Sequence, residues 1–195
     1  MNVSLIQNWF KENHGVMTSK ELIELGVTYY SIRHLLAEGI ISKIKRGVYL
    51  LNDTSEDENG LIVKLLPKGV YCLQSAASIY NYTTSVPLRY HIAVHNKANH
   101  NLPDHPPIKL YYWKDSQYEL GIEEKEINGV NIKIYDREKT VCDYFKFRNK
   151  LEFTSVKEVL NSYLRDTNRD IVRLKKYSRV LKIDKVLDHY LEVLI

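Results

Sequence analysis

The sequence predicts an α+β protein with an N-terminal winged helix-turn-helix (residues 1–51), an acidic linker (52–60) and a mixed α+β domain with a helical C-terminal part (61–195). Two helix-like segments and a hairpin-like segment with a basic tip follow one another between Thr18 and Leu51. The stretch from Asn52 to Gly60 carries four acidic residues and no basic one, which is typical of a domain boundary. Beyond it, strand-like segments come first and helix-like segments follow, as in an α+β domain.

The first element expected is a short N-terminal helix. Its apolar residues recur at helical spacing and are expected in the core of the first domain: Leu5, Ile6, Trp9 and Phe10. This segment has no basic start and no long apolar run, so we expect neither a signal peptide nor a membrane span. Cys72 and Cys142, the only cysteines, lie far apart, which indicates reduced thiols in a cytoplasmic protein.

Two helices joined by a tight turn are expected next. Thr18 and Glu21 have the spacing of a capping box, and Gly26 suits the left-handed position that ends a helix. Thr28 can cap the second helix, which Gly39 ends. At about 100° per residue, the core side of this helix carries Tyr29, Ile32, Leu35 and Leu36. The other side carries Tyr30, Arg33, His34 and Ala37.

A two-stranded hairpin completes the predicted winged module. Residues 40–45 and 48–51 are rich in β-branched and aromatic residues, and Lys45-Arg46-Gly47 forms the turn. Between Thr28 and Leu51 the single acid is Glu38, so positive charge collects on the second helix and the wing. In such modules the second helix enters a major groove. The expected DNA-binding residues are Thr28, Tyr29, Tyr30, Arg33, His34, Lys43, Lys45 and Arg46. The alternative is a small helical hairpin whose lysines are merely solvated.

The second region opens with two apolar runs, at residues 61–66 and 70–73, on either side of a Pro-Lys-Gly turn. A helix over residues 74–82, with Ser75 as its cap, and strands over 90–95 and 108–113 are expected next. Asn128-Gly129, flanked by the segments 125–127 and 130–135, is a strong signal for a hairpin. Helices are expected over 136–147, 155–165, 169–181 and 183–194.

The sequence offers little support for an enzyme. His91, His95, His100 and His105 have no familiar metal-ligand spacing, so we expect no metal and no cofactor. The segment 136–139 contains two carboxylates and a lysine, the ingredients of a metal-dependent nuclease, but an N-cap with an acidic first turn explains it better. A DNA-targeted nuclease remains one alternative; a ligand-sensing transcription factor is another.

A second basic surface is expected near the C-terminus. Residues 139–185 contain 13 basic and six acidic side chains, in a chain whose net charge is +4. Four of the basic residues line one side of the helix over 169–181: Arg169, Arg173, Lys176 and Arg179. Because like charges at this spacing repel one another, such a ridge suggests an anionic partner, either DNA or a second nucleic acid. A solvated basic face is the alternative.

The chain resembles the AbiEi antitoxins of bacterial type IV toxin–antitoxin and abortive-infection systems, and a streptococcal-type member in particular. The resemblance rests on residues 19–51, with Arg46-Gly47-Val48-Tyr49, and on the segments CLQSAASIYNY and YDREKTVCDYFKFRN. It implies a phage-defence antitoxin that represses its own operon by cooperative binding to inverted repeats in operator DNA. It also implies a nucleotidyltransferase-like toxin, opposed without a stable complex. We expect no membrane partner and a monomer in solution.

Overall fold

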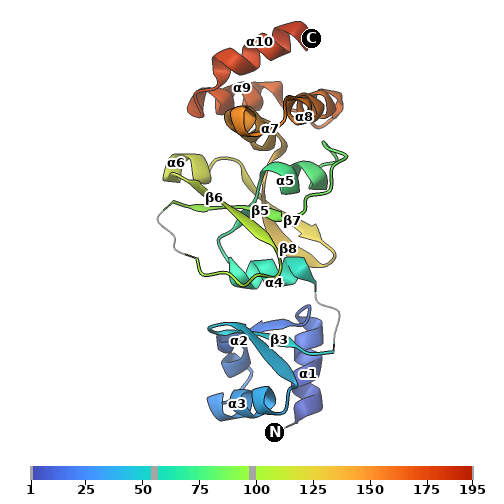
Figure 1. Ribbon diagram of the computed structural model, residues 1–195, viewed down its shortest axis with the longest axis vertical. Coiled ribbons are helices and arrows are strands. Elements are labelled where there is room, and N and C mark those ends of the chain that lie inside the picture. Colours follow the sequence, from blue (N-terminus) through green and yellow to red (C-terminus); the bar gives the residue numbers. More distant parts are fainter. Residues whose placement is uncertain (1, 54–56, 97–99, 195) are drawn as a thin grey trace. The chain divides into compact units, whose positions relative to one another are not determined.

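The computed structural model describes residues 2–53, 57–96 and 100–194 and has a mixed α+β architecture (Figure 1). Its contacts divide the chain into two compact units. The first comprises residues 1–69, 100–106 and 126–131, and the second comprises 70–99, 107–125 and 132–195. Within the described residues, none of the helices combines the length and the apolar composition needed to cross a bilayer.

The first unit contains the helices and the hairpin expected from the sequence. Its elements are α1 (Val3–Glu12), β1 (Val16–Thr18), α2 (Ser19–Glu24), α3 (Tyr29–Ala37), β2 (Ile41–Lys45), β3 (Val48–Leu51) and α4 (Glu58–Leu65). The strand β1 was not expected. It pairs antiparallel with β3, with Met17 opposite Tyr49, so the sheet has the order β1-β3-β2.

The predicted helix caps of this unit are confirmed. The Thr18 hydroxyl accepts a hydrogen bond from the Glu21 backbone N–H at 3.2 Å, and the Glu21 carboxylate accepts one from the Thr18 N–H at 2.7 Å. Gly26 follows α2 with a φ of 84°, a left-handed conformation that residues with a Cβ atom rarely adopt. Thr28 accepts from the Ser31 N–H at 3.1 Å and so fixes the start of α3. Local chemistry thus determines both ends of the turn between α2 and α3.

The core of the first unit differs from the expectation at two positions. Its fully buried residues include Phe10, Leu22 and Leu35, which join α1, α2 and α3. Leu5, expected in the core, is 44% exposed. Tyr29, expected on the core side of its helix, is 64% exposed. Tyr29 is the first residue of α3. Ile32, three residues later, is the first residue of this helix to be buried.

Part of the expected linker is helical. Asp57 caps α4 through a hydrogen bond from the Asn59 N–H at 2.9 Å, so residues 58–60 of the expected linker are helical. The apolar run 61–66, expected as the opening of the second region, is mostly the rest of α4, and by its contacts it groups with the first unit. Residues 54–56 of the expected linker lie outside the described residues.

The second unit has the expected order of strands followed by helices. Its elements are β4 (Val70–Tyr71), α5 (Leu73–Ile79), β5 (Tyr90–His95), β6 (Ile108–Trp113), α6 (Asp115–Tyr118), β7 (Ile122–Ile127), β8 (Val130–Tyr135), α7 (Arg137–Phe147), η1 (Arg148–Lys150), α8 (Phe153–Arg165), α9 (Ile171–Val180) and α10 (Asp184–Leu194). By its contacts, the hairpin end of β7 and β8, residues 126–131, groups with the first unit. The sheet order is β6-β5-β4-β8-β7. Asn128 and Gly129 have φ values of 51° and 82°, as a tight hairpin turn requires.

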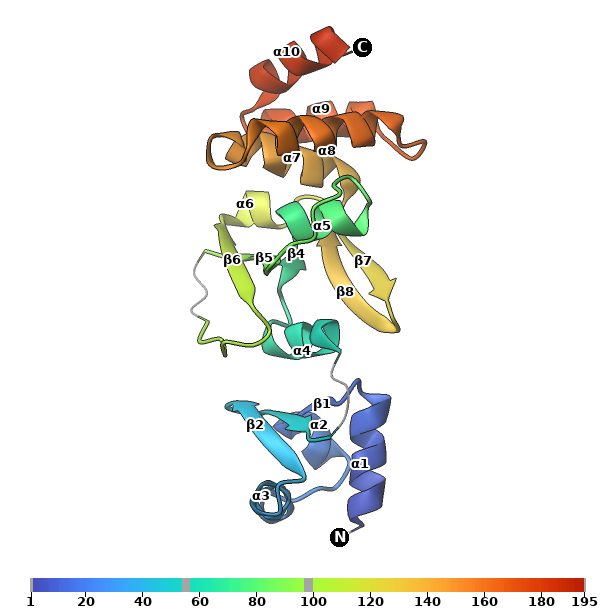
Figure 2. The same cartoon turned by 45° about the vertical axis from the view of Figure 1, so that its right-hand side comes forward.

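Helix α7 is the centre of this unit, packing against α5, α8 and α9 (Figure 2). Asp136 caps it through a hydrogen bond from the Lys139 N–H at 2.7 Å, as the sequence indicated. Ser75, by contrast, does not cap α5: it lies inside the helix, and its hydroxyl accepts a hydrogen bond from the His91 N–H at 2.8 Å. Cys72 and Cys142 are free and buried, in agreement with the expected reduced thiols.

Candidate nucleic-acid interface

The N-terminal half of α3 presents a set of exposed polar and aromatic side chains. Tyr29 and Tyr30 are 64% and 74% exposed, and Arg33 and His34 are exposed as well. Ile32 and Leu35, on the other side of the helix, are buried and hold α3 on the first unit. The start of a helix offers unpaired backbone N–H groups, and an exposed guanidinium offers a planar fork of donors. This face can therefore donate hydrogen bonds to an anionic or acceptor-rich partner.

The hairpin adds two more exposed cations. Lys43 lies on β2 and Arg46 in the turn, and both are exposed. Among the described residues, no carboxylate lies within 4.0 Å of the cationic groups of Arg33, Lys43 or Arg46. Their positive charge is therefore available to an external partner.

Lys45 differs from its neighbours in the hairpin. Its Nζ donates a hydrogen bond to the backbone carbonyl of Leu65 at 2.6 Å, and the side chain is partly buried. Burial lowers the pKa of Lys45. Lys45 was expected to bind DNA together with Lys43 and Arg46, but unlike them it is partly buried and has a partner within the chain. Its partner lies 20 residues away in the sequence, which no local pattern reveals.

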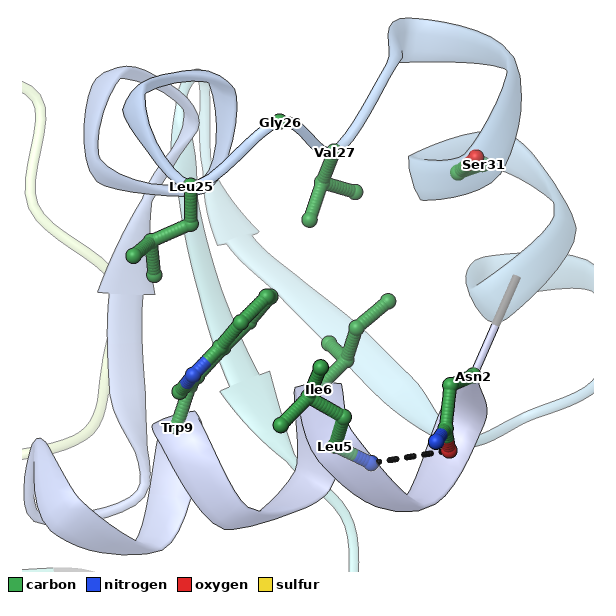
Figure 3. Close-up of a pocket in the computed structure, with 8 residues that line it drawn as sticks. All are labelled: Asn2, Leu5, Ile6, Trp9, Leu25, Gly26, Val27 and Ser31. Atoms are coloured by element: carbon green, nitrogen blue, oxygen red, sulfur yellow. Dashed lines mark hydrogen bonds between the residues drawn. The ribbon is translucent and has the colours of Figure 1, made fainter.

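A shallow apolar hollow of about 300 Å³ lies between α1 and the turn that joins α2 to α3. Leu5 and Trp9 of α1 face Leu25 and Val27 of the turn across it (Figure 3). The eight described residues that line it include no titratable side chain. The hollow explains why Leu5 is half exposed, and it offers no groups for catalysis or for anion binding.

The expected basic ridge on α9 is exposed but partly neutralised. The Arg173 guanidinium lies 4.0 Å from Asp136, 3.9 Å from Glu138 and 3.6 Å from Asp170. Arg169 precedes the helix and donates to the Asp166 carbonyl at 3.1 Å. The other two residues of the ridge, Lys176 and Arg179, are exposed, and neither forms an ion pair with the described residues. The ridge thus offers fewer available charges than the sequence suggests.

The charged segment at the start of α7 is buried rather than open. Lys139 and Asp143 are fully buried and form an ion pair with an Nζ–Oδ1 distance of 2.6 Å. The Lys139 ammonium also lies over the rings of Trp113 and Tyr135, 4.2 and 3.9 Å from their centres. Asp136 is 6% exposed, and burial raises its pKa to about 6. These groups face partners within the protein and present no carboxylate pair to solvent, which disfavours the nuclease alternative.

Three of the four histidines have separate partners. His91 is buried and lies 3.1 Å from the Tyr111 hydroxyl; burial, reinforced by Lys109, lowers its pKa to about 4. His95 is bonded to Asp115, and His105 lies 3.5 Å from Glu58. The part of the chain that the structure describes holds no group of three or more His, Cys, Asp or Glu residues arranged to bind a metal ion.

The comparison with known proteins bears on the same region as α3 and the hairpin. No curated protein sequence matches the chain. Residues 4–52 match a family model described as "Transcriptional regulator, AbiEi antitoxin". This range begins in α1 and ends just after β3, so it contains every exposed basic residue of α3 and of the hairpin. The N-terminal part of the chain is thus similar to the transcriptional-regulator domain of AbiEi antitoxins.

Proposed function

We propose that the chain is a DNA-binding transcriptional regulator and antitoxin, and that residues 1–51 act as a winged helix-turn-helix. In this proposal α3 enters the major groove, and the β2–β3 hairpin, the wing, lies over the phosphate backbone. The observation that carries it is the exposure of Arg33, Lys43 and Arg46, without carboxylate partners among the described residues, inside the segment that matches the family model.

The side chains of α3 have distinct roles in this proposal. Arg33 is best suited to read a guanine, because its guanidinium can donate two hydrogen bonds to O6 and N7. Tyr30 and His34, on the same exposed face, contact neighbouring base edges, while Thr28 and Tyr29 lie at the helix start near the backbone. Lys43 and Arg46 neutralise phosphates without reading sequence.

The finer function follows the family resemblance. We propose a cytoplasmic type IV antitoxin of streptococcal type that acts in abortive infection of phage-infected cells. It represses its own operon by cooperative binding to inverted repeats, as a monomer that assembles on the operator. Residues 61–195 oppose a nucleotidyltransferase-like toxin without forming a stable complex with it. Lys176 and Arg179, with Arg169 and Arg173 beside them, are the surface we propose for contact with a nucleic acid other than the operator DNA.

The test combines one binding assay with one cellular assay. The full chain is titrated with a duplex from the region upstream of its own gene and with a random duplex of equal length. We expect tighter binding to the upstream duplex, repression of a reporter under its control, and rescue of cells that express the toxin gene from the same operon. Equal affinity for both duplexes would contradict sequence-specific repression, and failure to rescue would contradict the antitoxin role.

A further inference from the structure

Helix α4 is tied to the proposed wing through its C-terminal end. Leu65 is the last residue of α4, and its carbonyl accepts the hydrogen bond from Lys45 Nζ at 2.6 Å. The last carbonyls of a helix have no partner within the helix, and the helix dipole makes this end negative. An ammonium at this point satisfies one carbonyl and is attracted by the dipole. The side chain of Lys45 is therefore used inside the protein.

Two further contacts connect α2 with α4 and with the hairpin. The Glu21 carboxylate, which completes the capping box of α2, also binds the ammonium of Lys64 in the last turn of α4. Partial burial raises the pKa of Glu21, but bonds from Lys64 and Thr18 outweigh it and lower the pKa overall. The Ser19 N–H, at the start of α2, donates to the carbonyl of Gly47 in the hairpin turn at 2.9 Å. Helix α2 is thus held from both sides.

Gly60 allows α4 to approach this closely. A Cβ atom added at Gly60 would lie 2.9 Å from the Cβ of His14, a distance that requires one of the two segments to move. Glycine inside a helix costs about 1 kcal/mol relative to alanine, so its presence in α4 calls for a reason. The close contact with the loop between α1 and β1 supplies that reason.

From these contacts we infer that α4 is a positioning element of the DNA-binding module, and that Lys45 orients the wing through α4 instead of binding a phosphate. The inference rests on the proposed DNA binding and deepens it. It assigns Lys45, Lys64 and Gly60 a positioning role, which they fulfil without contacting DNA. It also makes residues 57–66 part of the functional module, beyond the segment that matches the family model.

The salt dependence of DNA binding separates a phosphate contact from a positioning role. Each lost phosphate contact reduces the slope of log affinity against log salt by about 0.9. In the full chain we expect Lys43→Ala to reduce the slope by this amount. We expect Lys45→Met to weaken binding about tenfold, through loss of a charged hydrogen bond, with an unchanged slope.

A reduced slope for Lys45→Met, equal to that of Lys43→Ala, would overturn the inference and leave the proposed DNA binding intact. An unchanged affinity for Lys45→Met would overturn it as well. If the wild-type chain shows no salt-dependent binding to either duplex, the proposed function itself fails. The two failures are therefore distinguishable.

A pair of substitutions at the close contact tests the role of α4 without changing any charge on the wing. Helix propensity alone predicts that Gly60→Ala stabilises α4, whereas we expect it to displace α4 and to weaken DNA binding about tenfold with an unchanged slope. His14 has a φ of 57°, which glycine adopts freely, so His14→Gly removes the opposing Cβ without strain. The double variant should recover most of the lost affinity. Wild-type affinity for Gly60→Ala, or no recovery in the double variant, would contradict the inference.

Discussion

The basic residues of α3 and the β2–β3 hairpin differ from those of α9 in what surrounds them. Arg33, Lys43 and Arg46 are exposed, and within the described residues they have no carboxylate nearby. In the second unit Arg173 lies within 4.0 Å of three carboxylates, and Lys175 lies 3.5 Å from Asp188. A count of charges along the sequence treats both regions as nucleic-acid surfaces. The structure indicates that charge in the first region is available, whereas much of the charge in the second holds helices together.

The largest effect that this comparison predicts concerns the most buried cation. Lys139→Met should lower the free energy of unfolding by about 3–5 kcal/mol, because it leaves the Asp143 carboxylate buried without its partner. Arg46→Ala, at an exposed position, should change it by less than about 0.5 kcal/mol. Chemical denaturation of the full chain measures both. As a control, Lys139→Met/Asp143→Leu should recover most of the loss; equal effects of the two single substitutions would contradict the comparison.

The contribution of Asp136 to the stability of the folded chain should decrease as the pH rises, which is the opposite of the usual effect of a carboxylate. Burial raises its pKa from 3.8 to about 6 in the folded chain, so the folded state favours the protonated carboxyl. This stabilising contribution is fully present below pH 4 and is lost as the pH rises through 6. Its size is on the order of 2–3 kcal/mol, at 1.36 kcal/mol per pKa unit.

The measurement is the difference in unfolding free energy between the wild type and Asp136→Asn from pH 4 to pH 7. Asparagine keeps the N-cap of α7 and does not titrate. We expect the wild type to gain stability relative to the variant as the pH falls from 7 to 4. The difference is needed because Asp166, whose pKa is lowered to about 2 by hydrogen bonds from Tyr82 and Arg137 that outweigh burial, acts in the opposite direction. A constant difference across this range would contradict the role given to Asp136.

Arg33 should determine sequence preference rather than overall affinity. If it reads a guanine, Arg33→Ala reduces the discrimination between the upstream duplex and a random duplex by about 1–3 kcal/mol. Arg46→Ala is the matched control and should weaken binding to both duplexes equally. An equal loss on both duplexes for Arg33→Ala would make it a phosphate contact.

The parts of the fold that the sequence predicted are those fixed by local chemistry. The capping box of Thr18 and Glu21, the hairpin turn at Asn128-Gly129 and the N-cap of α7 at Asp136 each depend on residues close together in the chain. The short strand β1 was missed because three residues are too few to show alternation. Helix α4 was missed because Gly60 weakens its local signal, while its stabilising contacts come from residues distant in the sequence.

The same distinction applies to the candidate site. Exposure of Arg33, His34 and Tyr30 follows from helical periodicity, so the sequence was sufficient to predict it. The carbonyl that binds Lys45 belongs to Leu65, 20 residues away in the sequence. Two of the three carboxylates near Arg173, those of Asp136 and Glu138, lie 35 or more residues away. Only the folded chain reveals which basic residues already have partners.

The most direct test compares the salt dependence of DNA binding between two double variants. It asks whether the exposed cations of the hairpin, and not those of α9, bind the DNA. Lys43→Ala/Arg46→Ala removes two exposed cations from the hairpin, and Lys176→Ala/Arg179→Ala removes two exposed cations from α9. With the upstream duplex as the probe, we expect the first variant to lower the slope of log affinity against log salt by about 1.8 and the second to leave it unchanged. Equal slopes in the two variants, or a loss confined to the α9 variant, would contradict the assignment of the DNA-binding surface to α3 and the hairpin.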